Sequence, residues 1–223
     1  MNFSSPIANW RSIRRFRPES VPDEIIGRLL ESASRAPSWE NLQPWRFIVI
    51  TDPGIKEKLC ALSFKQKAIL RAPVVIACCG DTSAWERDSQ RKSLMELRES
   101  GVVAASDNVI ENLFLSTRSF APNLCGQPVV LARTFEAVSY AIAFMLIEAV
   151  NQGLGACVIG AFGNEITQDK IEDYMKLKQE LGVPDLCILL ALVCLGYPDE
   201  SPGPRPRKPL SEIAFRERWG QAF

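Results

Sequence analysis

Residues 135–152 are apolar on nearly every side of the helix that their spacing predicts. The apolar members of this stretch are Ala137, Val138, Ala141, Ile142, Phe144, Met145, Ile147 and Val150. A helix of this kind must be buried, because on a surface water would meet part of its apolar circumference. We therefore expect it either at the centre of the fold or in a contact between subunits.

Around this stretch, amphipathic helices alternate with short apolar strands. Apolar residues three and four apart predict a helix from Pro22 to about Arg35. Further helices are expected at residues 53–63, 84–100, 105–120 and 165–181, and strands at 45–51, 73–80, 156–160 and 186–195. Residues 121–128 are expected to form a loop, and the proline-rich residues 197–223 an extended C-terminal arm. Without repeats or linkers, residues 1–223 are predicted to form one domain of mixed helix and strand.

The charge balance excludes several classes of partner. Twenty-six basic residues balance 26 acidic ones, so no overall positive field is available to attract nucleic acid or an anionic membrane. No uninterrupted apolar run approaches the roughly 20 residues that cross a bilayer, and residues 1–17 lack the apolar segment of a signal peptide. We expect no membrane or nucleic-acid partner and a cytoplasmic location.

The cysteine and histidine counts limit the chemistry. The seven cysteines lie mostly in apolar stretches without C-x-x-C spacing, so we expect reduced core residues and no metal site. The chain has no histidine, which removes Ser-His-Asp and Cys-His catalysis and the H-E-x-x-H zinc site. An enzyme of this composition is most simply one whose bound cofactor carries the reaction.

Four arginines crowd residues 11–17 without one acidic residue. On a helical turn Arg11 and Arg14 would share a face, with the hydroxyl of Ser12 beside them. A guanidinium group donates paired hydrogen bonds to phosphate oxygens, so this segment is a candidate phosphate cradle. A solvated basic turn is the alternative. A second basic cluster in the arm contains Arg205, Arg207 and Lys208.

Residues 36–45 contain more polar side chains than a simple connection needs. Pro37 ends the preceding helix, and Ser38, Asn41 and Gln43 follow in a segment stiffened by prolines and tryptophans. Neutral amides both donate and accept hydrogen bonds, which suits a polyol chain or the edge of a heteroaromatic ring. A loop whose Ser and Asn merely cap the backbone is the alternative.

The glycines at residues 153–160 do not form a dinucleotide-binding fingerprint. Val158 stands where the third glycine should be, and the stretch leads from a helix into a strand. These glycines are instead expected to allow a close backbone approach, either to a helix or to a flat ligand.

Four motifs in order, at residues 11–16, 36–45, 153–160 and 195–210, together resemble the FMN-dependent nitroreductase family. The resemblance implies an α+β sandwich with a mostly antiparallel sheet, in an intertwined homodimer that exchanges C-terminal arms and binds FMN at the subunit interface. It assigns the FMN phosphate to Arg11, Ser12 and Arg14, with charge added by Arg205 and by Arg207 or Lys208. It assigns the ribityl chain and ring to Pro37, Ser38, Asn41 and Gln43, and places residues 158–161 against the ring. Among these, Ile159 and Gly160 are expected to touch the cofactor, the Gly160 amide facing the reactive nitrogen.

The sequence departs from the resemblance in two places. Better-known members often carry Pro-x-Glu-Gly where this chain has residues 158–161, so the nucleotide preference is open. Residues 81–133 also look longer than compact members need, which marks them as an insertion around the substrate cavity.

The expected activity is ping-pong hydride transfer from NADH or NADPH through FMN to a small nitroaromatic, quinone or other electron-poor acceptor. A flavin-fragmenting or dehalogenating relative and a flavin-binding protein without turnover are the alternatives. A nucleic-acid module is a more distant one.

Overall fold

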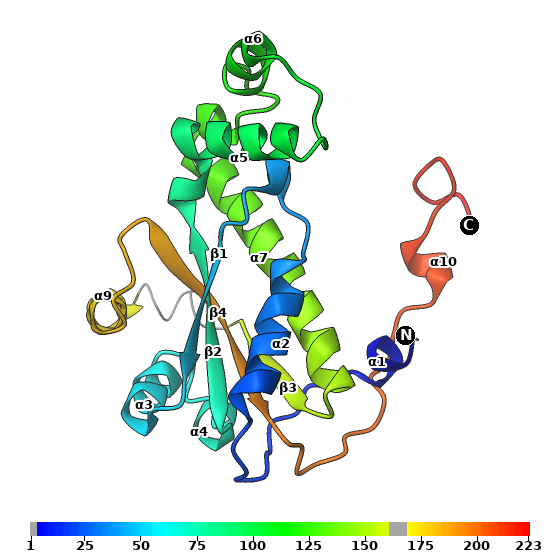
Figure 1. Cartoon of the computed structure of the whole chain (residues 1–223). Helices are drawn as coiled ribbons and strands as arrows, with labels where there is room; N and C mark the ends of the chain where they lie inside the picture. Colours follow the sequence, from blue (N-terminus) through cyan, green and yellow to red (C-terminus); the bar gives the residue numbers. More distant parts are fainter. Residues whose placement is uncertain (1–3, 161–168) are drawn as a thin grey trace.

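The computed structural model of the chain describes residues 4–160 and 169–223 (Figure 1). The described residues form a four-stranded sheet of β1 (Trp45–Ile50), β2 (Val74–Asp81), β3 (Gly155–Ile159) and β4 (Cys187–Gly196). The strand order is β1-β2-β4-β3, and all neighbours are antiparallel. The predicted strands are confirmed to within a residue or so at each end, because each is a short apolar run with turn residues beside it.

One face of the sheet is covered by α2 (Asp23–Ser34) and α7 (Gln127–Asn151). Ala137, Ala141 and Met145 of α7 are buried there. Alone among the described helices, α7 is long and apolar enough to cross a membrane, yet one side of it packs on the sheet as a core helix does. Its other side leaves Phe135 and Phe144 exposed, so the central position is confirmed for half of its circumference.

The helix α7 begins eight residues before the predicted start, so the expected loop at residues 121–128 is wrong at its end. Pro128 is the second residue of α7, where a backbone N–H would have no acceptor within the helix, so the missing N–H of proline costs nothing. The preceding Gly126, with a φ of 92°, lets the chain turn into the helix.

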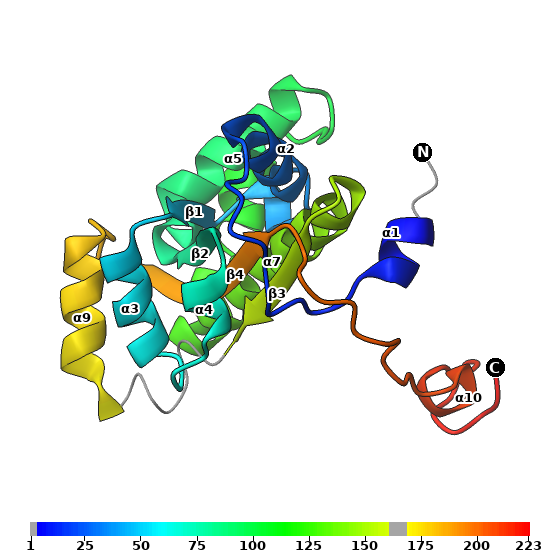
Figure 2. The same ribbon diagram turned by 90° about the horizontal axis from the view of Figure 1, so that it is seen from below.

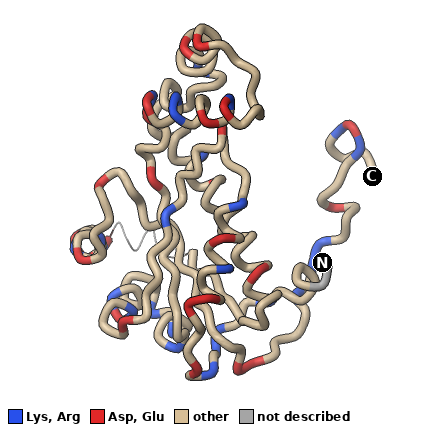
Figure 3. The backbone as a smooth tube through the Cα atoms, in the orientation of Figure 1, with Lys and Arg blue, Asp and Glu red and all other residues tan. Residues whose placement is uncertain are grey.

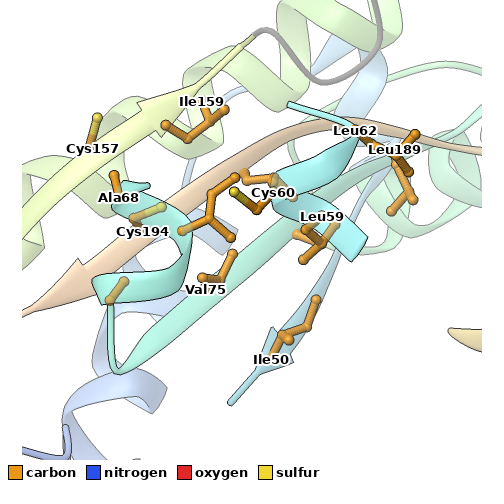
Figure 4. Close-up of a cluster of buried hydrophobic side chains, with 14 of the residues drawn as sticks. Ile50, Leu59, Cys60, Leu62, Ala68, Val75, Cys157, Ile159, Leu189 and Cys194 are labelled. Atoms are coloured by element: carbon orange, nitrogen blue, oxygen red, sulfur yellow. The ribbon is translucent and has the colours of Figure 1, made fainter. Parts of the chain in front are cut away.

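The opposite face of the sheet is covered by α3 (Pro53–Ala61), α4 (Ala68–Arg71) and α9 (Ile171–Glu180), as Figure 2 shows from below. Figure 4 shows Leu59 and Cys60 of α3 packed over Val75 and Cys194 of the strands. All seven cysteines are free, and six of them are buried, as expected of reduced core residues. The predicted helix at 165–181 begins among residues 161–168, which lie outside the described part of the chain.

The segment from 81 to 133 lies beyond one end of the sheet (Figure 1). Its long helix, α5 (Arg87–Glu99), is close to the prediction. The helix expected at 105–120 is confirmed only at 107–114: a short turn of helix, α6 (Asp107–Val109), runs into a widened helical turn at Ile110–Phe114 and ends there. The hydroxyls of Ser116 and Thr117 donate to the carbonyls of Glu111 and Leu113, and such bonds compete with helix continuation.

The chain after β4 is an exposed arm that carries the short α10 (Leu210–Ile213) away from the sheet, and α1 (Ser4–Asn9) projects on the same side (Figures 1 and 2). The predicted extended arm is therefore present. Figure 3 shows basic and acidic residues interspersed along the chain, in line with its balanced charge.

Candidate functional site

The N-terminal segment lies along the outer edge of β3. Ser12 bridges Ala156 in parallel, and the amide of Ile13 donates to the Ala156 carbonyl at 2.9 Å. A Cβ at Gly155 would lie 2.8 Å from three carbons of Ile13, so only glycine allows this approach. The glycine stretch therefore admits the N-terminal segment, neither a helix nor a ligand, at this position. The segment is extended, which corrects the helical turn expected for Arg11 and Arg14.

Three guanidinium groups gather near the start of β3. The Nη1 of Arg11 donates to the carbonyls of Ala8 at 2.7 Å and Trp10 at 2.8 Å. The guanidinium carbon of Arg205 lies 5.7 Å from the centre of the Trp10 ring. Burial raises the pKa of the Cys157 thiol, and the positive charges of Arg14 and Arg205 oppose this, which places both arginines near β3.

The other basic residues of the two clusters make different contacts. Arg17 stacks over Tyr197 at 5.2 Å, and Arg15 pairs with Glu200 at 3.2 Å. Arg207 donates to the adjacent carbonyl of Pro206, and Lys208 is exposed on the arm. Within the described residues of one chain, Arg205 is the member of the second basic cluster that lies at the cradle.

The cradle has the donors that an oxyanion needs. The carboxylate of Glu200 already accepts the backbone amides of Arg14 and Arg15, and the Arg14 amide holds the pKa of Glu200 below its usual range. Trp10 Nε1 is a buried donor with no partner among the described residues. Together with Arg11 and the buried Ser12, this donor set fits a phosphate group.

The second set of candidates forms a tight loop at residues 37–43. Glu40, Asn41 and Gln43 have φ values of 45°, 56° and 46°, a left-handed conformation that non-glycine residues seldom adopt. The Ser38 Oγ accepts the Gln43 amide at 3.0 Å and makes no bond to the helical turn after it. The Ser38 hydroxyl therefore makes a backbone contact of the kind that the capping alternative expects, to Gln43 rather than to the helical turn. Strained backbone of this kind is concentrated at functional sites.

A cavity of about 230 Å³ adjoins this loop. Asn41, Gln43, Arg46 and Lys92 are among the residues that line it. The amide groups of the loop thus face space that a ligand or a second chain can occupy.

The cradle and the loop lie at opposite ends of the sheet. Ala156, beside the cradle, is level with Leu195 and Val74, whereas Trp45, next to the loop, is level with Gly80. Six residue steps along β2 span about 20 Å, and the three strand spacings from β1 to β3 add about 14 Å sideways. The two groups of candidates are therefore roughly 25 Å apart in one chain.

Ile159 and Gly160 lie at the far end of β3, about 10 Å from the cradle by the rise of a strand. Ile159 is buried, and a Cβ at Gly160 would meet nothing within 4 Å among the described residues. The Gly160 backbone is thus open to approach. Ala161, the last member of the predicted ring-contacting run, lies outside the described residues.

Sequence reasoning missed Gln90 and Ser93 of α5, which bind the 37–43 loop through Glu40. One signal could have found Gln90: it lies four positions before Leu94, on the apolar side of an otherwise charged helix, and is buried like it.

The sequence is similar to a family model and to several characterised proteins. The model of the Nitroreductase family matches residues 7–197. An NADH dehydrogenase of Thermus thermophilus is 31% identical over 211 residues, covering 92% of this chain and 91% of that protein. An FMN reductase (NADPH) of Bacillus subtilis is 26% identical, over 95% of this chain and 72% of that protein. Iodotyrosine deiodinase 1 of Homo sapiens is 28% identical, over 91% of this chain and 64% of that protein.

Solved structures agree in fold. A nitroreductase-like protein from Streptococcus mutans superposes with a TM-score of 0.78 at 20% identity, covering 97% of this chain and 98% of that one. The NADPH:FMN oxidoreductase of Vibrio harveyi, solved in complex with NAD⁺, gives 0.69 at 19% identity, covering 98% of this chain and 78% of that one. The α+β fold with its antiparallel sheet, and the family match over most of the sequence, establish that this chain belongs to the nitroreductase family.

Proposed function

We propose that the chain catalyses ping-pong transfer of reducing equivalents from NADH or NADPH to a small electron-poor acceptor, such as a nitroaromatic compound or a quinone. It is an oxidoreductase of the nitroreductase family, and FMN is its cofactor. When bound, FMN supplies the hydride chemistry, which suits a chain without histidine. The observation that carries the proposal is the cluster of Arg11, Ser12, Arg14 and Arg205 around the start of β3.

The side chains of this protein bind and orient the cofactor. Arg11, Arg14 and Arg205 neutralise and hold the phosphate, with the Ser12 hydroxyl as a further donor. Ser38, Asn41 and Gln43 offer a hydroxyl and two amides to the ribityl chain and the ring edge, and Pro37 stiffens the start of that loop. The Gly160 amide lies on an open strand end, where it can donate to the ring. Arg207 and Lys208 stay candidates for the arm's contribution.

We infer a homodimer in which each cofactor contacts both copies. Candidates that lie roughly 25 Å apart in one chain cannot enclose one FMN, but the cradle of one copy can face the loop of another. The exposed side of α7 supports this, because Phe135, Tyr140 and Phe144 are 47%, 43% and 38% exposed. Such a surface on a helix is typical of a subunit contact. On the arm, Trp219 and Phe223 are 92% and 75% exposed, which favours exchange of arms between copies.

A reductive dehalogenase is the second candidate, favoured by the 28% identity to human iodotyrosine deiodinase 1. In either case we propose that residues 81–133 form a wall of the substrate cavity. Turnover of halogenated phenols without turnover of quinones would favour this candidate. The cytoplasmic location stays a prediction.

The test is anaerobic titration of the purified protein with each nucleotide, followed by visible absorption. We expect a bound flavin spectrum that NADH or NADPH bleaches and that a quinone restores with one-to-one stoichiometry. Bound flavin that neither nucleotide bleaches would instead indicate a flavin-binding protein without turnover. A colourless protein that takes up no added FMN would refute the proposal.

A further inference from the structure

The strained loop at residues 37–43 is held only in part by hydrogen bonds within itself. Two backbone bonds close its turn, from the Asn41 amide to the Ser38 carbonyl at 3.1 Å and from the Leu42 amide to the Trp39 carbonyl at 2.9 Å. Two more run from the Gln43 amide to the Ser38 Oγ and from the Gln43 side chain to the Asn41 carbonyl at 3.3 Å. None of these bonds uses the carbonyl or the carboxylate of Glu40, the first of the three left-handed residues. Such a backbone persists only where the surrounding structure determines it.

The surrounding structure here is α5. The Ser93 hydroxyl donates to the Glu40 carbonyl at 2.6 Å, and the Gln90 Nε2 donates to the Glu40 carboxylate at 2.6 Å. Gln90 and Ser93 are 1% and 8% exposed, so water competes little for these bonds. They therefore fix both the backbone and the side chain of Glu40.

A third connection extends the same network. The Gln90 Nε2 also donates to the Phe120 carbonyl at 2.9 Å, and Trp39 Nε1 donates to that carbonyl at 3.1 Å. Trp39 and Glu40, which lie between Ser38 and Asn41, are thus tied to two points of the 81–133 segment. None of these bonds uses the side chain of Asn41 or the hydroxyl hydrogen of Ser38, which stay available to a ligand.

We infer that Gln90 and Ser93 are positioning residues for the cofactor: through Glu40 they hold the 37–43 loop in the conformation that presents Ser38, Asn41 and Gln43 to the flavin. The inference deepens the proposed function and rests on it. It gives the inserted segment a second role beside that of cavity wall, since α5 sets the geometry of half of the cofactor site.

The test compares Ser93→Ala with Ser100→Ala, a serine at the end of the same helix whose hydroxyl donates to the Leu97 carbonyl. We expect Ser93→Ala to weaken FMN binding about tenfold, which corresponds to about 1.4 kcal/mol. Flavin fluorescence quenching measures the Kd, and circular dichroism of the bound flavin reports the ring environment. Ser93→Thr, which keeps the hydroxyl, should restore both, and Ser100→Ala should change neither.

Gln90→Met is the second variant, because it removes both side-chain bonds with little change in volume. Its control is Gln179→Met, at an exposed position of α9. We expect an increase in Kd of about tenfold or more, with the flavin dichroism altered in the same direction as in Ser93→Ala. Thermal melting of the cofactor-free proteins shows which variants are folded.

The outcomes separate the two proposals. Folded Ser93→Ala or Gln90→Met protein with wild-type Kd and wild-type flavin dichroism would overturn the positioning role and leave the proposed function intact. A Kd that rises in Ser100→Ala as much as in Ser93→Ala would also overturn it, since the effect would then be a general loosening of α5. Wild-type protein that binds no FMN would overturn both.

Discussion

Replacement of Arg11 by alanine should weaken FMN binding without unfolding the protein. In the structure, Nη1 of Arg11 donates to the carbonyls of Ala8 and Trp10, which holds the guanidinium at the cradle. Among the residues that the structure describes, the other two guanidinium nitrogens of Arg11 have no acceptor. Those nitrogens are therefore free to donate to a phosphate.

The size of the effect follows from the charge of the partners. A hydrogen bond to a charged group contributes about 1.5–3 kcal/mol, and 1.4 kcal/mol corresponds to about a factor of ten. The Kd for FMN should therefore rise about 10- to 150-fold. The affinity for riboflavin, which lacks the phosphate, should change little.

The assay is fluorescence titration of cofactor-free protein with FMN and with riboflavin. Arg17→Ala is the matched control, because Arg17 belongs to the same arginine-rich segment but pairs with Glu19 at 3.3 Å and stacks on Tyr197. If Arg11→Ala bound FMN as tightly as Arg17→Ala does, the phosphate cradle would be refuted.

Four further substitutions test the packing and the electrostatics. Gly155→Ala should lower the free energy of unfolding by about 1–3 kcal/mol, because the new methyl would lie 2.8 Å from Ile13 in the N-terminal segment. Gly27→Ala should raise the free energy of unfolding by about 0.5–1 kcal/mol, because the new methyl meets nothing within 4 Å. Urea titration measures both changes. Thr134→Val should lower it by about 1–3 kcal/mol in the same assay, since Trp85 Nε1 would lose its acceptor at 2.8 Å, and an unchanged midpoint would contradict this. Burial raises the pKa of the Glu40 carboxyl, so its ionisation opposes folding above that pKa and has no effect on stability below the unfolded value near 4.5. Glu40→Gln should therefore raise the Tm at pH 8 but not at pH 4. Equal shifts of the Tm at both pH values would argue against the buried charge.

The strands and the first long helix follow from the sequence because their signals are local. The run of residues 45–51 is apolar and begins after Pro44, so its register depends little on the rest of the chain. The same holds for β2, β4 and α2. The start of α7 was missed because Arg133 and Thr134 interrupt the apolar pattern, whereas the structure buries Thr134 as the acceptor for Trp85.

The sequence predicts which residues belong to the candidate site better than it predicts where they lie in space. Arginine side chains indicate phosphate contacts and amide side chains indicate ring-edge contacts, because the residue type alone determines which hydrogen bonds each can make. Their placement depends on tertiary structure: the cradle is extended because Ser12 pairs with β3, and Glu40 is held by Gln90, fifty positions away. No local pattern specifies contacts of that range.

The proposed dimer places each FMN between the cradle of one copy and the loop of the other. It is tested most directly by co-expressing an Arg11→Ala chain with an Asn41→Ala chain under different tags and titrating the purified mixed species with FMN. We expect two phases, in which half of the sites bind FMN as tightly as wild type and half bind it more weakly than either parent. If the mixed species bound FMN in one phase at the affinity of the single variants, or if no mixed species formed, the claim would be contradicted.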